Sequence, residues 1–261
     1  MVPRCITIAG SDSGGGAGIQ ADLKAFAAAG VHGMAAIVAL TAQNTREVSA
    51  VQEVPPWFVR AQLDAVTGDI GVDAVKTGML FSRPIIETVA DWLEENQRPL
   101  VPLPVVVDPV MVASSGARLL EDDAVEVLLG RLFPLATVVT PNLHEARALV
   151  GSDGPPAELA EALVDLGAPA VLVTGGHGEV STDHLFANGG HYEILFKRSE
   201  TAATHGSGCT HSATLAALLG RELSLLRAAQ GAAEAASRAV AQGFVEIGAG
   251  DGPVNVLGVS R

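Results

Sequence analysis

Two glycine-rich segments could bind an anion through their backbone N–H groups. Gly10–Gly18 has five glycines in nine residues, and Thr204–Thr210 comes directly before a run rich in alanine and leucine. Glycine permits positive φ angles and a close approach of ligand to backbone, while a helix N-terminus offers N–H donors and partial positive charge. The first segment matches neither the phosphate-loop pattern nor G-x-G-x-x-G. Each segment is therefore a candidate anion site, and for the first a purely structural turn is an equal alternative.

Cys209 is the residue of the second segment that could take part in proton transfer. We expect the N–H groups of Gly206, Ser207, Gly208 and Cys209 to point into one space. Thiol pKa values fall at helix N-termini, so the position predicts an accessible thiolate. The alternative is that Cys209 is only a small residue at the start of the helix.

Oxygen-bearing side chains follow three of the expected strands. Asp108 ends one strand, Asn142 and Glu145 follow the next, and Thr174 and Gly176 belong to a Thr-Gly-Gly-His turn over which a nucleotide could lie. Because Asn142 and Glu145 are three residues apart, they share a face of the opening helical turn and could bind Mg²⁺ through water. Helix capping by Asn142, with Glu145 completing a capping box, explains the same pair almost as well.

A further polar cluster could read the edge of a heterocyclic ring. Gln43, in the segment Thr41–Thr45, offers both a donor and an acceptor, as an aminopyrimidine edge requires. An ordinary polar loop is the alternative. Met79 follows the strand that carries Lys76, although a methionine there more often fills a core. Asp22 falls one turn into the helix after the first glycine segment, near the strand ends.

The elements that must position these residues alternate between short apolar strands and longer helical segments. The expected strands are Cys5–Ala9, Ala35–Leu40, Ala74–Thr77, Val105–Asp108, Thr137–Thr140 and Ala170–Thr174. The expected helices are Ile19–Ala29, Trp57–Thr67, Ile85–Glu95, Asp123–Leu132, His144–Val150 and Glu158–Leu166. This alternation predicts βαβ units in an α/β fold with a central, mostly parallel sheet, whose ligands lie beyond the carboxyl ends of the strands.

The last third of the chain departs from that alternation. Asp183–Ala187 and His191–Phe196 flank Asn188-Gly189-Gly190 and predict a β-hairpin extension at a sheet edge. Two helices should follow, at Cys209–Leu219 and Leu225–Gln242. No long linker or internal repeat divides the sequence, so we expect a single domain over residues 1–261.

Composition excludes several classes of protein. The chain has 261 residues, 48% of them hydrophobic, and a formal net charge of −13 with only three lysines, which argues against nucleic-acid binding. Its two cysteines require no oxidising compartment, and we recognise no signal peptide or membrane span. We expect a cytoplasmic protein that binds small molecules.

Seven segments in their order resemble the hydroxymethylpyrimidine/phosphomethylpyrimidine kinases of thiamin biosynthesis. They are AGSDSGGGAGIQADLKAF at 9–26, ALTAQNT at 39–45, DAVKTGML at 73–80, VVDPVM at 106–111, TPNLHEA at 140–146, TGGH at 174–177 and THGSGCT at 204–210. The resemblance covers residues 5 to about 250. It implies the three-layer ribokinase-like fold, with a central mostly parallel sheet flanked by helices.

The resemblance also implies an activity and a set of roles. The activity is phosphorylation by ATP of 4-amino-5-hydroxymethyl-2-methylpyrimidine and then of its monophosphate, with Mg²⁺, by a homodimer. Matching motif positions assign the following residues to substrate: Gln43, Gly10, Asp22, Met79 and Val110. They assign Gly206, Ser207, Gly208 and Cys209 to phosphoryl transfer, with Cys209 where relatives carry an aspartate base. Asn142, Glu145, Asp108, Thr174 and Gly176 are associated with ATP and Mg²⁺, the metal being held by Glu145 and Asn142 through water.

Two alternatives to this activity stay open at the level of sequence. A pyridoxal kinase of the same superfamily would bind a similar ring with a neighbouring hydroxymethyl group. A non-catalytic pyrimidine-binding domain could keep the fold, although it would not require Asn142, Glu145 or the Gly206–Cys209 segment. The chain also has Thr174 where the kinase family often has a lysine.

Overall fold

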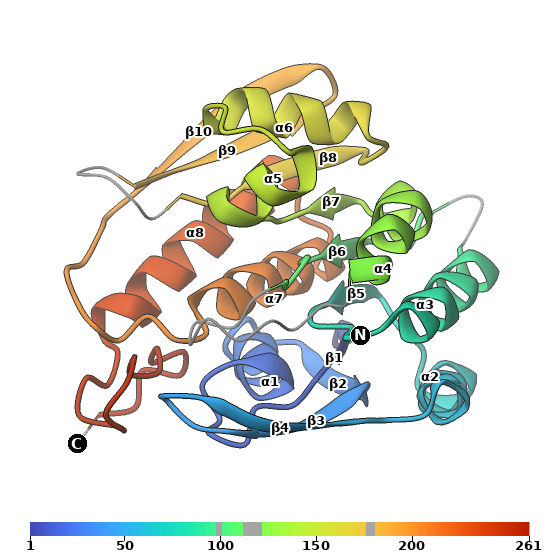
Figure 1. The fold of residues 1–261 in the computed structure, drawn as a ribbon, viewed down its shortest axis with the longest axis horizontal. Helices are drawn as coiled ribbons and strands as arrows, with labels where there is room; N and C mark the ends of the chain where they lie inside the picture. The colour runs from blue at the N-terminus through green and yellow to red at the C-terminus, as the bar shows by residue number, and fades with distance from the viewer. Residues whose placement is uncertain (98–100, 112–121, 176–180, 261) are drawn as a thin grey trace.

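The computed structural model describes residues 1–97, 101–111, 122–175 and 181–260. Within them eight strands form one sheet in the order β10-β9-β8-β7-β6-β5-β1-β2 (Figure 1). The strands are β1 Arg4–Ala9, β2 His32–Ile37, β5 Ala74–Thr77, β6 Val105–Val107, β7 Val138–Val139, β8 Ala170–Val173, β9 Ser181–Ala187 and β10 Gly190–Phe196. In this spatial order, neighbouring strands from β8 to β2 pair in parallel, whereas β8–β9 and β9–β10 pair antiparallel. The predicted mostly parallel sheet with a hairpin extension is confirmed.

Helices cover both faces of the sheet, as Figure 1 shows. One face carries α1 Gly18–Ala28, α7 Ser207–Gly220 and α8 Leu225–Ala241. The other carries α2 Pro56–Asp69, α3 Arg83–Asn96, α4 Asp122–Val127, α5 Leu143–Val150 and α6 Pro156–Asp165. The chain after α4 continues as a π turn, Leu128–Leu132, and a 3₁₀ turn, Phe133–Leu135. The expected three-layer architecture, a central sheet between two layers of helices, is therefore present.

The buried strands are apolar on both sides because both faces of the sheet are covered. In β6, Val105 and Val107 pack against the α2–α6 face, whereas Val106 packs against α7. The neighbouring strand β5 follows the same alternation, with Val75 on the first face and Ala74 on the second. Lys76 therefore projects into the layer of α1 and α7, a direction that matters for the site.

The predicted strand Ala35–Leu40 is wrong as a single element. The chain leaves the central sheet after Ile37 and forms a separate antiparallel pair, β3 Ala39–Gln43 with β4 Val48–Glu53. In Figure 1 this pair runs along the edge opposite the β9–β10 hairpin. Leu40 is half exposed in β3, so the apolar run that suggested one buried strand crosses two different environments. Gln43 consequently ends a strand rather than lying in a loop.

None of the described helices combines the length and apolar character needed to cross a membrane.

Local chemistry explains where two of the helices begin and end. Gly151 is the C-cap of α5 and adopts a left-handed conformation with φ of 72°. Pro156 opens α6, where its missing N–H costs nothing.

Candidate active site

A cavity of about 750 Å³ opens at the carboxyl ends of the parallel strands. It is lined by residues that follow β1, β5, β6, β7 and β8, by the end of β3, by residues 196–201, and by the turn that begins α7. Parallel sheets place their ligands at this edge. The topology therefore brings together segments that are up to 200 positions apart.

The Gly206–Cys209 segment forms the N-terminus of α7, as predicted. Gly206 is the N-cap with φ of 84°, and a Cβ there would come within 1.7 Å of the Gly16 carbonyl oxygen. Both glycine-rich segments therefore meet at Gly16 and Gly206. The Ser207 amide already donates to the Thr204 carbonyl oxygen at 3.1 Å. The amides of Gly208 and Cys209, in the first helical turn, have no partner further back in the helix and remain as the donors for an anion.

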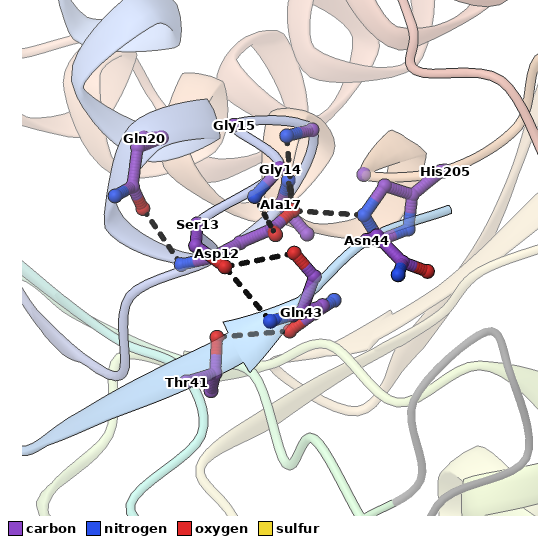
Figure 2. Close-up of polar contacts among 12 residues, drawn as sticks. Asp12, Ser13, Gly14, Gly15, Ala17, Gln20, Thr41, Gln43, Asn44 and His205 are labelled. Carbon is purple, nitrogen blue, oxygen red and sulfur yellow. Dashed lines mark hydrogen bonds and ion pairs between the residues drawn. The ribbon is translucent and has the colours of Figure 1, made fainter. Parts of the chain in front are cut away.

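Asp12 holds the first glycine segment in shape (Figure 2). Its carboxylate accepts from the amides of Gly14, Gly16 and Ala17 at 2.8 to 2.9 Å and contacts His205 Nε2 at 2.9 Å. Burial alone would raise the pKa of Asp12, but His205 and the amides of Ala17 and Gly14 lower it below its ordinary value. Sequence reasoning missed Asp12, although an aspartate preceding a glycine tract is a recognisable turn signal.

Four of the five residues assigned to the ring lie together on the cavity wall: Gly10, Gln43, Met79 and Val110. Gly10 and Met79 are in contact, because a Cβ on Gly10 would lie 2.3 Å from Met79 Cε. Gln43 Oε1 lies 3.3 Å from Thr41 Oγ1, and the backbone N–H of Gln43 donates to Ser13 Oγ at 2.8 Å (Figure 2). The Gln43 backbone is thus tied to the first glycine-rich segment, and its carboxamide lies beside Thr41.

Asp22, the fifth, does not line the cavity. It is fully buried and binds Lys76 Nζ at 2.9 and 3.0 Å and Thr7 Oγ1 at 2.6 Å. Lys76 does line the cavity, and its Nζ lies 3.9 Å from Asp108 Oδ2. Burial alone would lower the pKa of Lys76, but Asp22, Cys209 and Asp108 outweigh it and raise the pKa above its ordinary value. Asp22 therefore faces the site only through Lys76, a residue whose role the sequence did not reveal.

The predicted thiolate at Cys209 is wrong for the protein without ligands. Burial raises the pKa of the Cys209 thiol to about 12, although Lys76 acts in the opposite direction. The nearby carboxylates of Asp22 and Asp108 reinforce the rise. The helix N-terminus is thus outweighed by desolvation and by like charge, and Cys209 is a thiol at neutral pH.

Asn142 and Glu145 form the capping box that was the alternative explanation of their spacing. Asn142 Oδ1 accepts from the Glu145 amide, and Glu145 Oε2 accepts from the Asn142 amide, both at 2.9 Å. Both residues still line the cavity, so the capping role and an additional ligand role are compatible. Burial, and then the charge of Asp108, raise the pKa of Glu145 to about 8. Burial also raises the pKa of Asp108.

This carboxylate pair fits a divalent cation. Two buried acidic groups that repel each other and face a cavity provide the hard oxygen ligands that Mg²⁺ prefers, and a cation between them would favour their charged forms. Ser212 Oγ donates to Asp108 Oδ2 at 2.7 Å and fixes that carboxylate.

The residues that the resemblance associates with ATP include two in the segment after β8. Thr174 lines the cavity, whereas Gly176 lies outside the described residues. Asp183, at the start of β9, accepts from the Gly175 amide at 2.8 Å and contacts His211 Nε2 at 3.0 Å. Lys197 and Arg198 contribute positive charge to the same cavity from the segment after β10.

The architecture and this cavity define a class of protein, the ribokinase-like kinases. The structure superposes on the ADP complex of Bacillus subtilis pyridoxal kinase with a TM-score of 0.88, 37% identity, and coverage of 98% of this chain and 97% of the other. It also resembles Staphylococcus aureus pyridoxal kinase in complex with AMP-PCP and pyridoxal, with a TM-score of 0.87, 32% identity and coverage of 99% and 94%.

Sequence comparison narrows the class to one family. The chain is 48% identical to the hydroxymethylpyrimidine/phosphomethylpyrimidine kinase of Rhizobium meliloti (strain 1021), over 98% of this chain and 97% of the relative. The family model of phosphomethylpyrimidine kinase matches residues 12–255. The chain belongs to the phosphomethylpyrimidine kinase family.

Proposed function

We propose that this protein phosphorylates 4-amino-5-hydroxymethyl-2-methylpyrimidine and then its monophosphate, with ATP as donor. In each step an acceptor oxygen bonds to the γ-phosphorus of ATP and the bond to the bridging oxygen breaks, so ADP leaves. In the first step the acceptor is the hydroxymethyl oxygen, whose proton is released, and in the second it is an anionic oxygen of the monophosphate. The observation that carries the proposal is one cavity that joins a ring-sized pocket at Gln43 and Met79 to the amides of Gly208 and Cys209. Transfer between them needs chiefly positioning and charge stabilisation.

Gln43 is proposed to select the ring. Its amide group can donate to a ring nitrogen and accept from the exocyclic amine, while Met79 and Val110 contact the apolar faces. The carboxamide oxygen lies 3.3 Å from Thr41 Oγ1. Gln43→Leu should raise KM for the pyrimidine about tenfold or more, because a buried polar edge of the substrate would lose its partner.

The phosphoryl group is proposed to sit at the N-terminus of α7. The Gly208 and Cys209 amides and the helix dipole would stabilise the charge on its oxygens, while Lys76 supplies a fixed cation held by Asp22. Mg²⁺ at Glu145 and Asn142, through water, with Asp108 nearby, would neutralise phosphate charge when it is bound.

Lys197 and Arg198 are proposed to supply the positive charge of the lysine that the family often has where this chain has Thr174. Both are exposed side chains in the segment that lines the nucleotide end of the cavity. Lys197→Ala with Arg198→Ala should raise KM for ATP several-fold and change kcat little. Unchanged KM would show that Thr174 and its neighbouring backbone suffice.

Product masses test the proposal directly. Purified protein is incubated with MgATP and hydroxymethylpyrimidine, and products are followed by mass spectrometry. A monophosphate that converts to a diphosphate supports both steps. Ligand binding without any phosphorylated product would instead support the non-catalytic domain.

Pyridoxal kinase activity is the second candidate. The resemblance to solved pyridoxal kinases in complex with ADP, or with AMP-PCP and pyridoxal, favours testing it in the same assay. Phosphorylation of pyridoxal alone would replace the main proposal, whereas phosphorylation of both rings would broaden it. We further propose a homodimer in the cytoplasm, which sedimentation and cell fractionation would test.

A further inference from the structure

Three metal-binding side chains gather on the β9–β10 hairpin, away from the residues assigned to phosphoryl transfer. They are His184 of β9 and His191 and Glu193 of β10, and their ligand atoms all lie within 4.8 Å of one another. Glu193 is the direct cross-strand partner of His184, and His191 is two residues before Glu193. Side chains two apart in a strand share a face, so all three project from the same side of the hairpin.

The spacing of the two imidazoles suits a small tetrahedral ion. His184 Nδ1 and His191 Nε2 are 3.0 Å apart, and the two rings are nearly parallel, with an interplanar angle of 13°. Two nitrogens that each lie about 2.0–2.1 Å from a tetrahedral Zn²⁺ are separated by about 3.3 Å. A movement of a few tenths of an ångström would therefore convert the present nitrogen–nitrogen contact into two bonds to one ion.

Charge and access also favour a cation here. His184 is partly buried, whereas His191 and Glu193 are exposed, so an ion can enter from solvent. The Glu193 carboxylate lies beside the two imidazoles and adds an oxygen ligand to their nitrogens.

We propose that His184, His191 and Glu193 form a Zn²⁺-binding site on the outer face of the hairpin, with water as the fourth ligand. Two histidines and a glutamate are a familiar ligand set for this ion, and three protein ligands leave one position open. The ion would join β9 to β10 on the face opposite Asp183, which lines the cavity. The site thus holds the register of the hairpin strand that leads into Lys197 and Arg198.

Calorimetry with Zn²⁺ tests the site. Tag-free, chelator-treated full-length protein is titrated with Zn²⁺ in excess Mg²⁺, which occupies oxygen-rich sites. We expect one saturable equivalent, at least tenfold weaker in His191→Gln and in Glu193→Gln, since even loss of a supporting contact costs about 10- to 100-fold in metal affinity. Zn²⁺ should also raise the melting temperature of the parent more than that of either variant. Co²⁺ should give the absorption bands of a tetrahedral ion in the parent.

Two control variants test whether Zn²⁺ binds at the hairpin and not elsewhere. His32→Gln removes an exposed histidine from β2, far along the sheet order from the hairpin, and should leave Zn²⁺ affinity unchanged. Cys209→Ala removes the cavity thiol and should also leave it unchanged. Equal Zn²⁺ affinity in the parent and His191→Gln, or no saturable binding at all, would overturn the proposal and leave His184 and His191 as a hydrogen-bonded pair.

Discussion

Lys76 is held in the core by charge compensation, which makes its removal costly. The ammonium group is fully buried between Asp22 and Asp108. Lys76→Met would leave Asp22 as an uncompensated buried charge, and removing one partner of such a pair typically costs about 3–5 kcal/mol. Lys76→Met combined with Asp22→Asn should recover much of that loss.

Urea denaturation of the parent, both single variants and the double variant measures this coupling. Recovery in the double variant is the expected result, whereas single effects that simply add would contradict the assigned pairing. Activity should stay low in every variant that lacks Lys76, because the cation that faces the cavity is gone.

Cys209 gives a prediction about pH. Because its pKa is raised to about 12, the thiolate fraction is small at neutral pH and grows about tenfold per pH unit. If Cys209 accepts the hydroxyl proton, kcat/KM should rise between about pH 7 and pH 9. Cys209→Ala should lower kcat about 100-fold, the lower end of what a positioned base contributes, and flatten this rise.

Steady-state kinetics of the parent and Cys209→Ala over that pH range make the check. A turnover within a few-fold of the parent would show that Cys209 is not the base. A rise with pH that persists in Cys209→Ala would place the titration elsewhere, with Glu145 as the group next in line because its pKa is raised to about 8.

At the level of single residues, the sequence predicted those whose role depends on their backbone N–H groups or on partners a few positions away. The Gly206–Cys209 turn and the Asn142–Glu145 pair were predictable because both depend on neighbours within a few positions. The Lys76–Asp22 contact was not, because it requires the pairing of β1 with β5 and the packing of α1 against β1. The thiol pKa of Cys209 was mispredicted for the same reason, since burial is a tertiary property.

Among the elements, the junction of the two glycine-rich segments depends on Asp12. Its carboxylate joins three amides of the first segment to His205, which directly precedes Gly206. Asp12→Asn would lose the charge and leave at least one donor unsatisfied, at a cost of about 1–3 kcal/mol. It should also lower activity by loosening the contact of Gly16 with Gly206.

The pH dependence of stability checks this role with a definite sign. The folded-state pKa of Asp12 is lowered, so its contribution is present above the unfolded pKa of about 3.9 and is lost as the pH falls through the lower, folded value. The difference in unfolding free energy between parent and Asp12→Asn should therefore be full at pH 7 and shrink below about pH 4. A difference that is the same at pH 7 and pH 3 would contradict the assignment.

The order of the elements was predictable where periodicity and turn chemistry agreed. Five parallel strands, namely β1, β5, β6, β7 and β8, together with the β9–β10 hairpin follow from apolar runs bounded by glycine and proline. The pair β3–β4 was missed because β4 alternates weakly, with Ser49 and Ala50 exposed, and because Leu40 points outward. Such a strand is defined by its partner rather than by its own pattern.

For the whole molecule, the charge of −13 poses the question of how an acidic protein binds polyphosphate. In the proposed function the positive potential is local: Lys76, Lys197 and Arg198 line the cavity, and the amides of α7 and a Mg²⁺ ion would add to it. Because these contacts act at short range, salt should change KM for MgATP by less than about threefold between 0.05 and 0.3 M. The same salt should raise the melting temperature, since screening relieves repulsion over the acidic surface. Kinetics and thermal melts at matched ionic strength, with NaCl compared against KCl to separate a specific ion effect, provide the measurement. A tenfold change in KM would show that the surface charge, and not the cavity alone, governs the approach of the nucleotide.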